Sequence, residues 1–314
     1  MKRIIPNKRK IAFNRKRRCR NLILLLLISI VISETSYFLT FKLNRLICNE
    51  PNVDYISKDY NKSKISKSES NDSNLQSTEV INTVNSFMDD AEFVYKYLFQ
   101  QTQGIMPDGA NGDKIAYLTF DDGPSETVTP LILDILKEKE VKGTFFIIGK
   151  QINSSPTSIE LLKRILNEGH SIGNHTFSHD YSFLYPNQFA NINNILSDIE
   201  KTNIELKQVL GDDFKTRIIR LPGGNMSWHN TQDIDKVLNK NGYYSIDWNV
   251  VNGDAEGKTK NADELLEQVE LSIRNREKAI ILMHDTYGKE ETAKALPKII
   301  DFLREQGYEF HVIK

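Results

Sequence analysis

Residues 115–125 read IAYLTFDDGPS, and this stretch contains the pattern on which the fold prediction rests. Its first six residues form an almost continuous apolar run, which is typical of a strand that is covered on both faces. Two adjacent aspartates, Asp121 and Asp122, follow the run directly and precede a Gly-Pro turn. Because sites in parallel α/β proteins form at the carboxyl ends of strands, these carboxylates are the first candidates for a functional site.

Strand-like and helix-like segments then alternate along the rest of the chain. Such alternation predicts an α/β fold with a parallel sheet, either open and doubly wound or closed as a barrel, and periodicity alone does not separate the two. The predicted strands lie at 115–120, 144–149, 171–176, 217–222, 243–250, 279–284 and 308–313. The predicted helices lie at 129–140, 157–168, 188–210, 232–241, 262–277 and 291–306.

Charge is unevenly distributed along the 314 residues, whose formal net charge is −1. Residues 1–20 contain ten Lys/Arg and no acidic residue, so the remainder carries −11 once these ten charges are taken from the total. That excess of acidic groups argues against a body that binds nucleic acid. Only two cysteines occur, Cys19 and Cys48, so the predicted α/β region beyond them cannot be a disulfide scaffold.

The apolar segment LILLLLISIVIS at 22–33 follows this basic stretch. One interpretation is a transmembrane signal-anchor at 22–41, with the leader 1–21 in the cytoplasm and the rest of a single-pass protein outside the cell membrane. Glu34 counts against the anchor, because a carboxylate inside a membrane costs about 2.5–3.5 kcal/mol on insertion scales. The alternative is a signal peptide that is cleaved near Ser33, which would release the protein. A buried soluble helix and a nucleic-acid-binding arm explain the segment less well.

The next segment is polar and lacks apolar periodicity, as in SKDYNKSKISKSESNDSN at 57–74. Such a composition cannot bury enough surface to offset the entropy lost on ordering. We therefore expect a flexible stalk at 42–112, with a helix near 84–99, ahead of a catalytic domain at 113–314. The membrane is an expected partner, nucleic acid is not, and the sequence identifies no protein partner.

Polar side chains recur at the predicted strand ends. His175 and His179 are four residues apart, which in a helical or turn-like segment places both imidazoles within reach of one cation. Two histidines and one carboxylate make a three-ligand set with open positions, as in catalytic zinc sites and related centres. An isolated pair of histidines is more often structural, but the Asp121-Asp122 pair and His284 at equivalent strand ends favour a metal site. The residue types leave open which aspartate binds the metal.

These residues resemble the polysaccharide deacetylase family, also called NodB-homology domains or carbohydrate esterase family 4. The resemblance covers about residues 113–314 and includes five motifs in order. It implies a distorted (β/α) barrel of about seven parallel strands. It also implies a divalent metal, Zn²⁺ or alternatively Co²⁺, and hydrolysis of acetyl groups on polysaccharides. The motifs are TFDDGPS (119–125), HTFSH (175–179), RLPGG (220–224), DWNVVNGDA (247–255) and LMHD (282–285).

The family's roles carry over residue by residue. The resemblance implies Asp121 as general base and Asp122, His175 and His179 as metal ligands. It also implies Arg220 as the residue that orients the base, His284 as general acid with Asp254 as its tuning carboxylate, and Leu282 as a wall of the acetate pocket.

Two positions depart from the family pattern. Gly223 stands where the family often has tyrosine, whose backbone N–H helps to bind the oxyanion, and glycine can keep that role. Ala255 stands where many members have tryptophan. These departures concern the shape of the acceptor site rather than the chemistry, and Trp228 or Trp248 is a candidate replacement for the lost aromatic surface.

The resulting prediction is an extracytoplasmic, metal-dependent hydrolase that removes N-acetyl groups from a cell-wall polysaccharide, with N-acetylglucosamine residues of peptidoglycan as the favoured substrate. Chitin oligosaccharides, N-acetylmuramic acid, other amino-sugar polymers and acetylated xylan are alternative substrates. A non-catalytic glycan-binding module and an unrelated α/β metal hydrolase, such as a peptidase, are alternatives of other classes. The complete ligand set argues against the binding module, and the five ordered motifs argue against the unrelated hydrolase.

Overall fold

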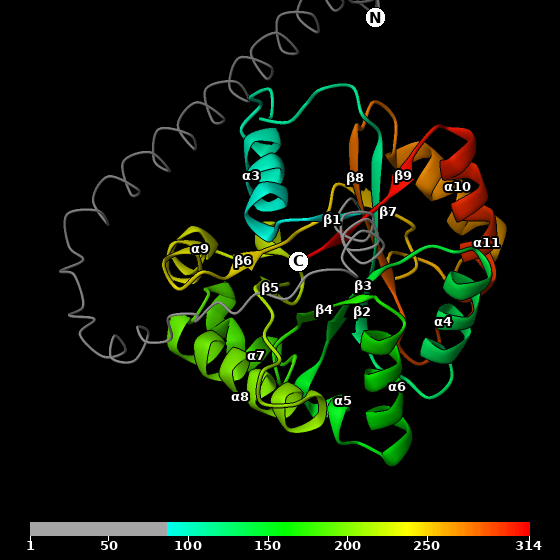
Figure 1. Ribbon diagram of the computed structural model, residues 1–314. Coiled ribbons are helices and arrows are strands. Elements are labelled where there is room, and N and C mark those ends of the chain that lie inside the picture. The colour runs from blue at the N-terminus through cyan, green and yellow to red at the C-terminus, as the bar shows by residue number, and fades with distance from the viewer. Residues whose placement is uncertain (1–86) are drawn as a thin grey trace, which may run out of the picture. The chain divides into compact units, whose positions relative to one another are not determined.

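The structure is a computed structural model that describes residues 87–314 (Figure 1). The predicted leader at 1–21, the anchor at 22–41 and residues 42–86 of the predicted stalk lie outside the described residues. From residue 87 onward, no helix combines the length and the apolar character that crossing a membrane requires.

Seven parallel strands form the central sheet in the spatial order β6-β5-β4-β3-β2-β8-β7. The two ends of this order, β6 and β7, are not paired with each other, so the barrel stays open along one seam. The predicted α/β fold with about seven parallel strands is therefore confirmed. The strands are β2 (Ile115–Gly123), β3 (Thr144–Ile147), β4 (Ser171–Asn174), β5 (Ile218–Ile219), β6 (Tyr244–Ser245), β7 (Val250–Val251) and β8 (Lys278–His284).

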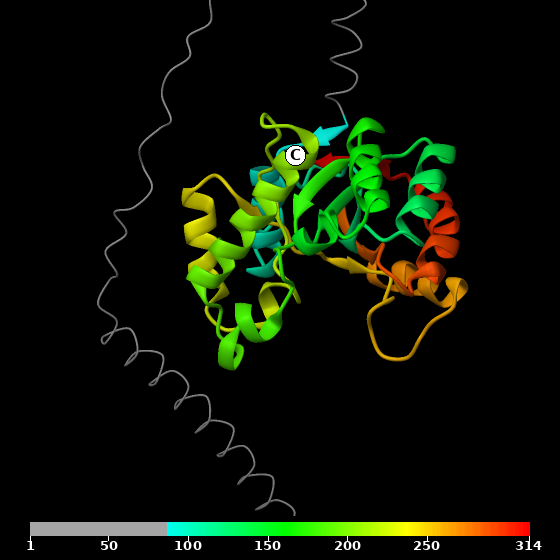
Figure 2. The same cartoon turned by 90° about the horizontal axis from the view of Figure 1, so that it is seen from below.

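The predicted helices are all present, and their ends carry recognisable caps. Ser155 accepts the N–H of Ser158 ahead of a helix that begins with Pro156. Asn261 forms a capping box with Glu264 at another helix. Figure 2 shows α4, α10 and α11 grouped on one flank of the sheet and α8 and α9 on the other. The helices are α4 (Thr129–Glu138), α5 (Gly149–Ile152), α6 (Pro156–Asn167), α7 (Tyr181–Leu184), α8 (Ile192–Leu210), α9 (Thr231–Lys240), α10 (Ala262–Ser272) and α11 (Glu290–Glu305), with short 3₁₀ turns η1 (Pro186–Gln188) and η2 (Asn225–Ser227).

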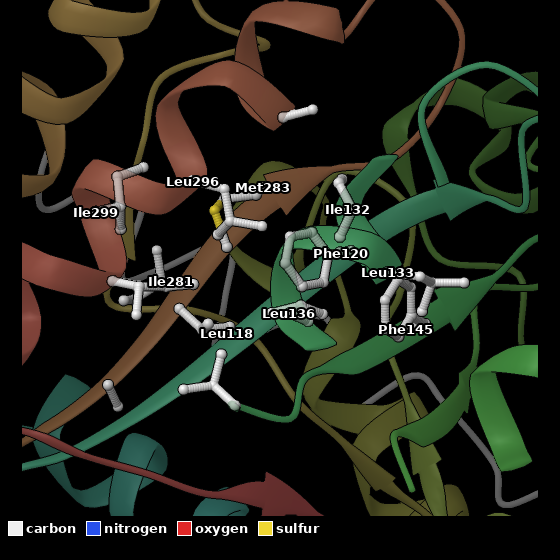
Figure 3. Packing of buried hydrophobic residues seen from close by; sticks show 14 of the residues in the cluster. Leu118, Phe120, Ile132, Leu133, Leu136, Phe145, Ile281, Met283, Leu296 and Ile299 are labelled. Carbon is white, nitrogen blue, oxygen red and sulfur yellow. The ribbon is translucent and has the colours of Figure 1, made fainter. Parts of the chain in front are cut away.

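The side chains of the two central strands, β2 and β8, point alternately to the hydrophobic core and to the opposite face of the sheet, where the site lies. Leu118 and Phe120 of β2, with Ile281 and Met283 of β8, pack against α4 and α11 (Figure 3). The residues between them face the other side of the sheet, because successive side chains of a strand point to opposite faces. Tyr117 and Ile280 begin that inner face in a second apolar cluster. Further along both strands, the inner face becomes polar and reaches the candidate site.

The prediction of one strand at 243–250 is wrong. The segment forms β6 and β7 at opposite ends of the sheet, and residues 246–249 cross between them. Arg220 explains the break, because its Nε donates to the carbonyl oxygen of Ile246 (2.8 Å) and its Nη2 donates to that of Asp247 (3.3 Å). These carbonyls are therefore bonded to a side chain rather than to a neighbouring strand.

The last predicted strand is also divided in two. β9 (Glu309–Phe310) pairs with β2, whereas β10 (Val312–Ile313) pairs with β1 (Met88–Asp89). After β1, helix α3 (Ala91–Thr102) packs Val94 and Leu98 against the inner apolar cluster of the sheet. Asp90 caps this helix by accepting the N–H of Glu92. The packed body therefore includes residues 88–102, which precede the predicted domain boundary at 113.

Candidate active site

Adjacent carboxylates reach the same site because the end of β2 is irregular. Asp121 lies on the inner face and is paired in register with His284 of β8. Strict alternation would turn Asp122 toward the helices. Instead, the pairing with β3 shifts between Asp121 and Gly123, and Asp122 adopts a φ of 72°. A positive φ at a non-glycine residue is strained, and such strain often accompanies functional sites.

His175 and His179 lie on a turn that follows β4, rather than on a helix. Thr176 and His179 have φ values of 62° and 50°, so the turn requires external support. Asp198 of α8 supplies it, since its Oδ2 accepts the N–H of Phe177 (3.0 Å) and the N–H of Ser178 (2.7 Å). The turn thereby brings the two imidazole rings to within 4.9 Å of each other, centroid to centroid.

Asp122, His175 and His179 form a cluster whose three potential ligand atoms all lie within 4.8 Å of one another. Oδ1 of Asp122 is 3.3 Å from Nε2 of each histidine. This oxygen is buried and accepts no hydrogen bond within the described part of the chain. Nδ1 of His175 donates to the carbonyl oxygen of Arg220 (2.7 Å), which leaves Nε2 free to coordinate. One carboxylate and two imidazoles in this arrangement fit a divalent ion such as zinc.

The protonation states of Asp122 and His179 suit a cation, whereas burial is outweighed at His175 by the carboxylates of Asp121 and Asp122, which raise the pKa of His175, so a bound cation would have to displace a proton there. Burial opposes ionisation of Asp122, but the close approach of the His175 imidazole and the nearby histidine charges hold the pKa of Asp122 well below its usual range. Burial, followed by the charge of His175, lowers the pKa of His179 to about 4. A carboxylate and a neutral imidazole are the forms that bind metal ions.

Arg220 holds Asp121 beside this cluster. The arginine is fully buried, and its Nη1 donates to Oδ1 of Asp121 (2.8 Å) and to Oγ1 of Thr119 (2.7 Å). Its guanidinium also lies 4.1 Å from the ring centroid of Phe146 and 5.6 Å from that of Trp248. Trp248 thus serves in the packing of Arg220. The second carboxylate oxygen, Oδ2 of Asp121, lies 3.8 Å from Nε2 of His175 and faces the cluster.

His284 and Asp254 form a hydrogen-bonded pair on the other side of Asp121. Nδ1 of His284 lies 2.7 Å from Oδ1 of Asp254, and the His284 main-chain N–H donates to Oδ2 (2.9 Å). Burial disfavours the charged imidazole, but the hydrogen bond and charge of Asp254 raise the pKa of His284 to about 9. His284 is therefore protonated at neutral pH and can act as a general acid.

Gly223 and Leu282 lie at the edges of the group. Gly223 has a φ of 80°, and a Cβ there would lie 3.1 Å from Nε1 of Trp228. Trp228 donates from this nitrogen to the carbonyl oxygen of Pro222 (2.8 Å), which fixes the loop after Arg220. Leu282 precedes His284 by two residues on the inner face of β8 and is partly exposed.

Three positioning residues were not among the predicted site residues. Asp198 holds the histidine turn, as described above. Asp247 is partly buried and accepts the N–H of Asn225 (3.1 Å), so it supports the loop that contains Gly223. Thr292 of α11 donates to Oδ2 of Asp254 (2.7 Å). Asp198 and Thr292 lie outside the five motifs, and Asp247 opens one of them, but the partner of each is distant in sequence, so spacing could not reveal the contact.

An open parallel barrel with this group at its carboxyl edge is the architecture of a metal-dependent hydrolase, and known proteins narrow that class. The family model described as polysaccharide deacetylase matches residues 108–246. A peptidoglycan-N-acetylglucosamine deacetylase of Bacillus cereus is 31% identical over 64% of this chain and 86% of its own length. A chitooligosaccharide deacetylase of Bradyrhizobium is 30% identical over 70% of this chain and 96% of its own.

Solved structures also indicate the polysaccharide deacetylase family. A CE4 esterase of Streptococcus mutans superposes with a TM-score of 0.66 at 36% identity, over 74% of this chain and 94% of that one. The chain belongs to the polysaccharide deacetylase family. The predictions of this family and of a deacetylating enzyme are therefore confirmed, and the family's metal dependence agrees with the Asp122–His175–His179 cluster.

Proposed function

We propose that this enzyme removes N-acetyl groups from N-acetylglucosamine residues of peptidoglycan. One observation supports the chemistry above all others: Asp121 and His284 are register neighbours on the inner face of the sheet, next to the Asp122–His175–His179 cluster. A base, an acid and a metal site thus converge on one position. A glycan-binding module would have no need of a protonated histidine opposite a carboxylate.

The chain's own residues divide the reaction between them. A divalent ion held by Asp122, His175 and His179 would polarise the acetyl carbonyl and lower the pKa of water toward about 7. Asp121, fixed by Arg220, accepts the proton of the attacking water as the new carbon–oxygen bond forms. The main-chain N–H of Gly223 donates to the acetyl oxygen as negative charge develops there. His284 then protonates the sugar nitrogen, the carbon–nitrogen bond breaks, and acetate leaves.

The choice of substrate rests on the relatives. The B. cereus relative is named for peptidoglycan N-acetylglucosamine, whereas the Bradyrhizobium relative is named for chitooligosaccharides. Both names describe an N-acetylated glucosamine, which supports an amide rather than an ester as the scissile group. We favour peptidoglycan because the basic leader and the apolar segment at 22–41 would place the domain beside the cell wall.

We also propose the N-terminal arrangement predicted from the sequence: a single-pass anchor at 22–41 with the catalytic domain outside the cell, or release after cleavage near Ser33. N-terminal sequencing of the mature protein from membrane and medium fractions separates these two outcomes. An intact leader in the membrane fraction supports the anchor.

The activity is tested by incubating the full-length chain, loaded with Zn²⁺ or Co²⁺, with peptidoglycan fragments and with N-acetylglucosamine oligomers. Mass spectrometry should show loss of acetyl groups from glucosamine residues, together with free acetate. The matched control is His179→Ala, which should lose both the metal and the activity. Acetyl loss from chitin oligomers alone would replace peptidoglycan by chitin, and full activity in a metal-free preparation would refute the mechanism.

A further inference from the structure

Three aromatic rings lie in contact with one another beside the metal-ligand cluster. We call them the aromatic shelf: Tyr181, Tyr185 and Trp228. Tyr185 and Trp228 are stacked, with centroids 4.2 Å apart and ring planes within 3° of parallel. Tyr181 lies at a tilt 5.2 Å from Trp228 and 5.3 Å from the ring of His179. The shelf is therefore continuous with a proposed metal ligand.

The shelf is held rigidly from behind. Tyr185 is almost fully buried, and the indole N–H of Trp228 donates to the carbonyl oxygen of Pro222. Asp180 accepts the N–H of Ser182 (2.9 Å), which caps the short helix α7 that carries Tyr181. The backbone that carries Tyr181 and the rings beside it are therefore held in place, which reduces the conformational entropy to be lost on binding.

Tyr181 itself faces solvent, with 46% of its surface exposed in spite of its three ring neighbours. It also lies close to the reacting groups, because its ring contacts that of His179 at a centroid distance of 5.3 Å. On the far side, the shelf reaches Gly223, against which Trp228 packs so closely that a Cβ there would lie 3.1 Å from Nε1 of the indole. The exposed ring thus borders the position at which the acetyl group would react.

We propose that Tyr181 is a substrate-binding residue that stacks on a neutral pyranose ring adjacent to the acetylated sugar in the glycan chain. A pyranose presents an apolar face of C–H groups and a rim of hydroxyls. A tyrosine offers a rigid apolar face and a hydroxyl at its edge, and so matches both features at low entropic cost. This inference rests on the proposed function, because it takes the sugar at the metal cluster to be part of a glycan.

The test compares wild-type enzyme with Tyr181→Ala, Tyr181→Phe and Phe183→Ala on an N-acetylglucosamine pentamer. Loss of the ring should raise KM roughly tenfold, the size of one aromatic contact, with a smaller change in kcat. Tyr181→Phe keeps the ring and should restore most of the affinity that Tyr181→Ala loses. Phe183 is 37% exposed on the same four-residue helix, so Phe183→Ala controls for disturbance of α7.

Measurements of metal content and of pentamer affinity show whether a change in KM comes from weaker glycan binding or from loss of the metal. Equal metal content in all four proteins, with weaker pentamer binding by Tyr181→Ala in calorimetry, supports the inference. It is overturned if Tyr181→Ala binds the pentamer as tightly as wild type, if that variant loses metal, or if wild type does not bind the pentamer. A wild-type protein that binds glycans but releases no acetate would refute the proposed function instead, while the binding comparison would still decide the role of Tyr181.

Discussion

His175 and Arg220 are joined through the main chain: Nδ1 of the histidine donates to the arginine's carbonyl oxygen over 2.7 Å. The side chain of the same arginine donates to Oδ1 of Asp121 over 2.8 Å. One residue therefore orients a proposed metal ligand with its backbone and the proposed base with its guanidinium. One buried residue therefore sets the relative positions of the proposed base and the proposed metal ligand. Arg220 is itself held in place by the further hydrogen bonds that its side chain donates.

The two adjacent aspartates should respond differently to the same substitution. Asp121→Asn should retain the metal and lower kcat by roughly 10²–10⁴, because the amide can hold water but cannot accept its proton. Asp122→Asn should weaken metal binding, because Oδ1 of Asp122 is the oxygen that faces both histidines. Metal stoichiometry measured beside kcat checks this assignment. Metal loss in Asp121→Asn with retention in Asp122→Asn would show that the roles are exchanged.

The pH profile should depend on Asp254. His284 has a pKa raised to about 9, so its proton is available at neutral pH and is lost as the pH rises through about 9. In Asp254→Asn, the largest of the influences that raise the pKa of His284 is removed while the burial that lowers it remains, so the pKa of His284 should fall. The alkaline limb of kcat/KM should therefore move to lower pH. Asp263→Asn, an exposed aspartate on α10, serves as the control, and an unmoved limb in Asp254→Asn would contradict the acid assignment.

Thr292 should contribute to turnover without touching substrate. Its hydroxyl donates to Oδ2 of Asp254 (2.7 Å), while Oδ1 of that carboxylate faces His284. Thr292→Val keeps the shape but removes the donor, and kcat should fall roughly tenfold, the usual scale for a residue that supports an active-site group. KM and metal content should remain near wild type, and Thr292→Ser should restore kcat. If Thr292→Ser were as slow as Thr292→Val, the loss of kcat would be due to changed packing rather than to the missing hydroxyl donor.

The strand ends could be predicted because their signals are local. Asp121, Arg220 and His284 each follow apolar residues, His175 lies near the end of a short predicted strand, and the ends of parallel strands meet at one edge of the sheet. The structure brings these residues together as that reasoning expected. Their individual chemical roles stay predictions, because proximity alone does not distinguish a base from a ligand.

Other features depend on contacts that are distant in sequence. The break within 243–250 follows from carbonyl groups bound by Arg220, and nothing within the segment itself indicates that contact. The convergence of Asp121 and Asp122 depends on a bulge, whereas simple alternation would have separated them. The start of α3 could have been predicted locally, because Asp90 is a typical N-cap residue. The prediction of a helix near 84–99 placed this start too early.

The N-terminal segment of the packed body should contribute stability that depends on pH. Oδ2 of Asp89 in β1 accepts the hydroxyl of Tyr117 (2.6 Å) and faces Nδ1 of His311 (2.7 Å), which fastens β1 beside β10. Burial opposes ionisation, but the hydrogen bonds of His311 and Tyr117 lower the pKa of Asp89 below its ordinary 3.8. A depressed carboxyl pKa stabilises the fold above the unfolded pKa, and this contribution is lost as the pH falls through the folded pKa.

Asp89→Asn should therefore lower the free energy of unfolding by about 1–3 kcal/mol at neutral pH, the usual cost of losing a hydrogen-bonded charge. The difference from wild type should shrink as the pH falls below about 4, where the wild-type carboxylate begins to take up a proton. Urea denaturation of the full-length chain across this pH range measures both effects. Asp301→Asn, which removes an exposed ion pair with Lys139, should change stability by less than about 1 kcal/mol at every pH. An Asp89→Asn effect that is absent, or that persists undiminished in acid, would show that the charge of Asp89 does not fasten β1.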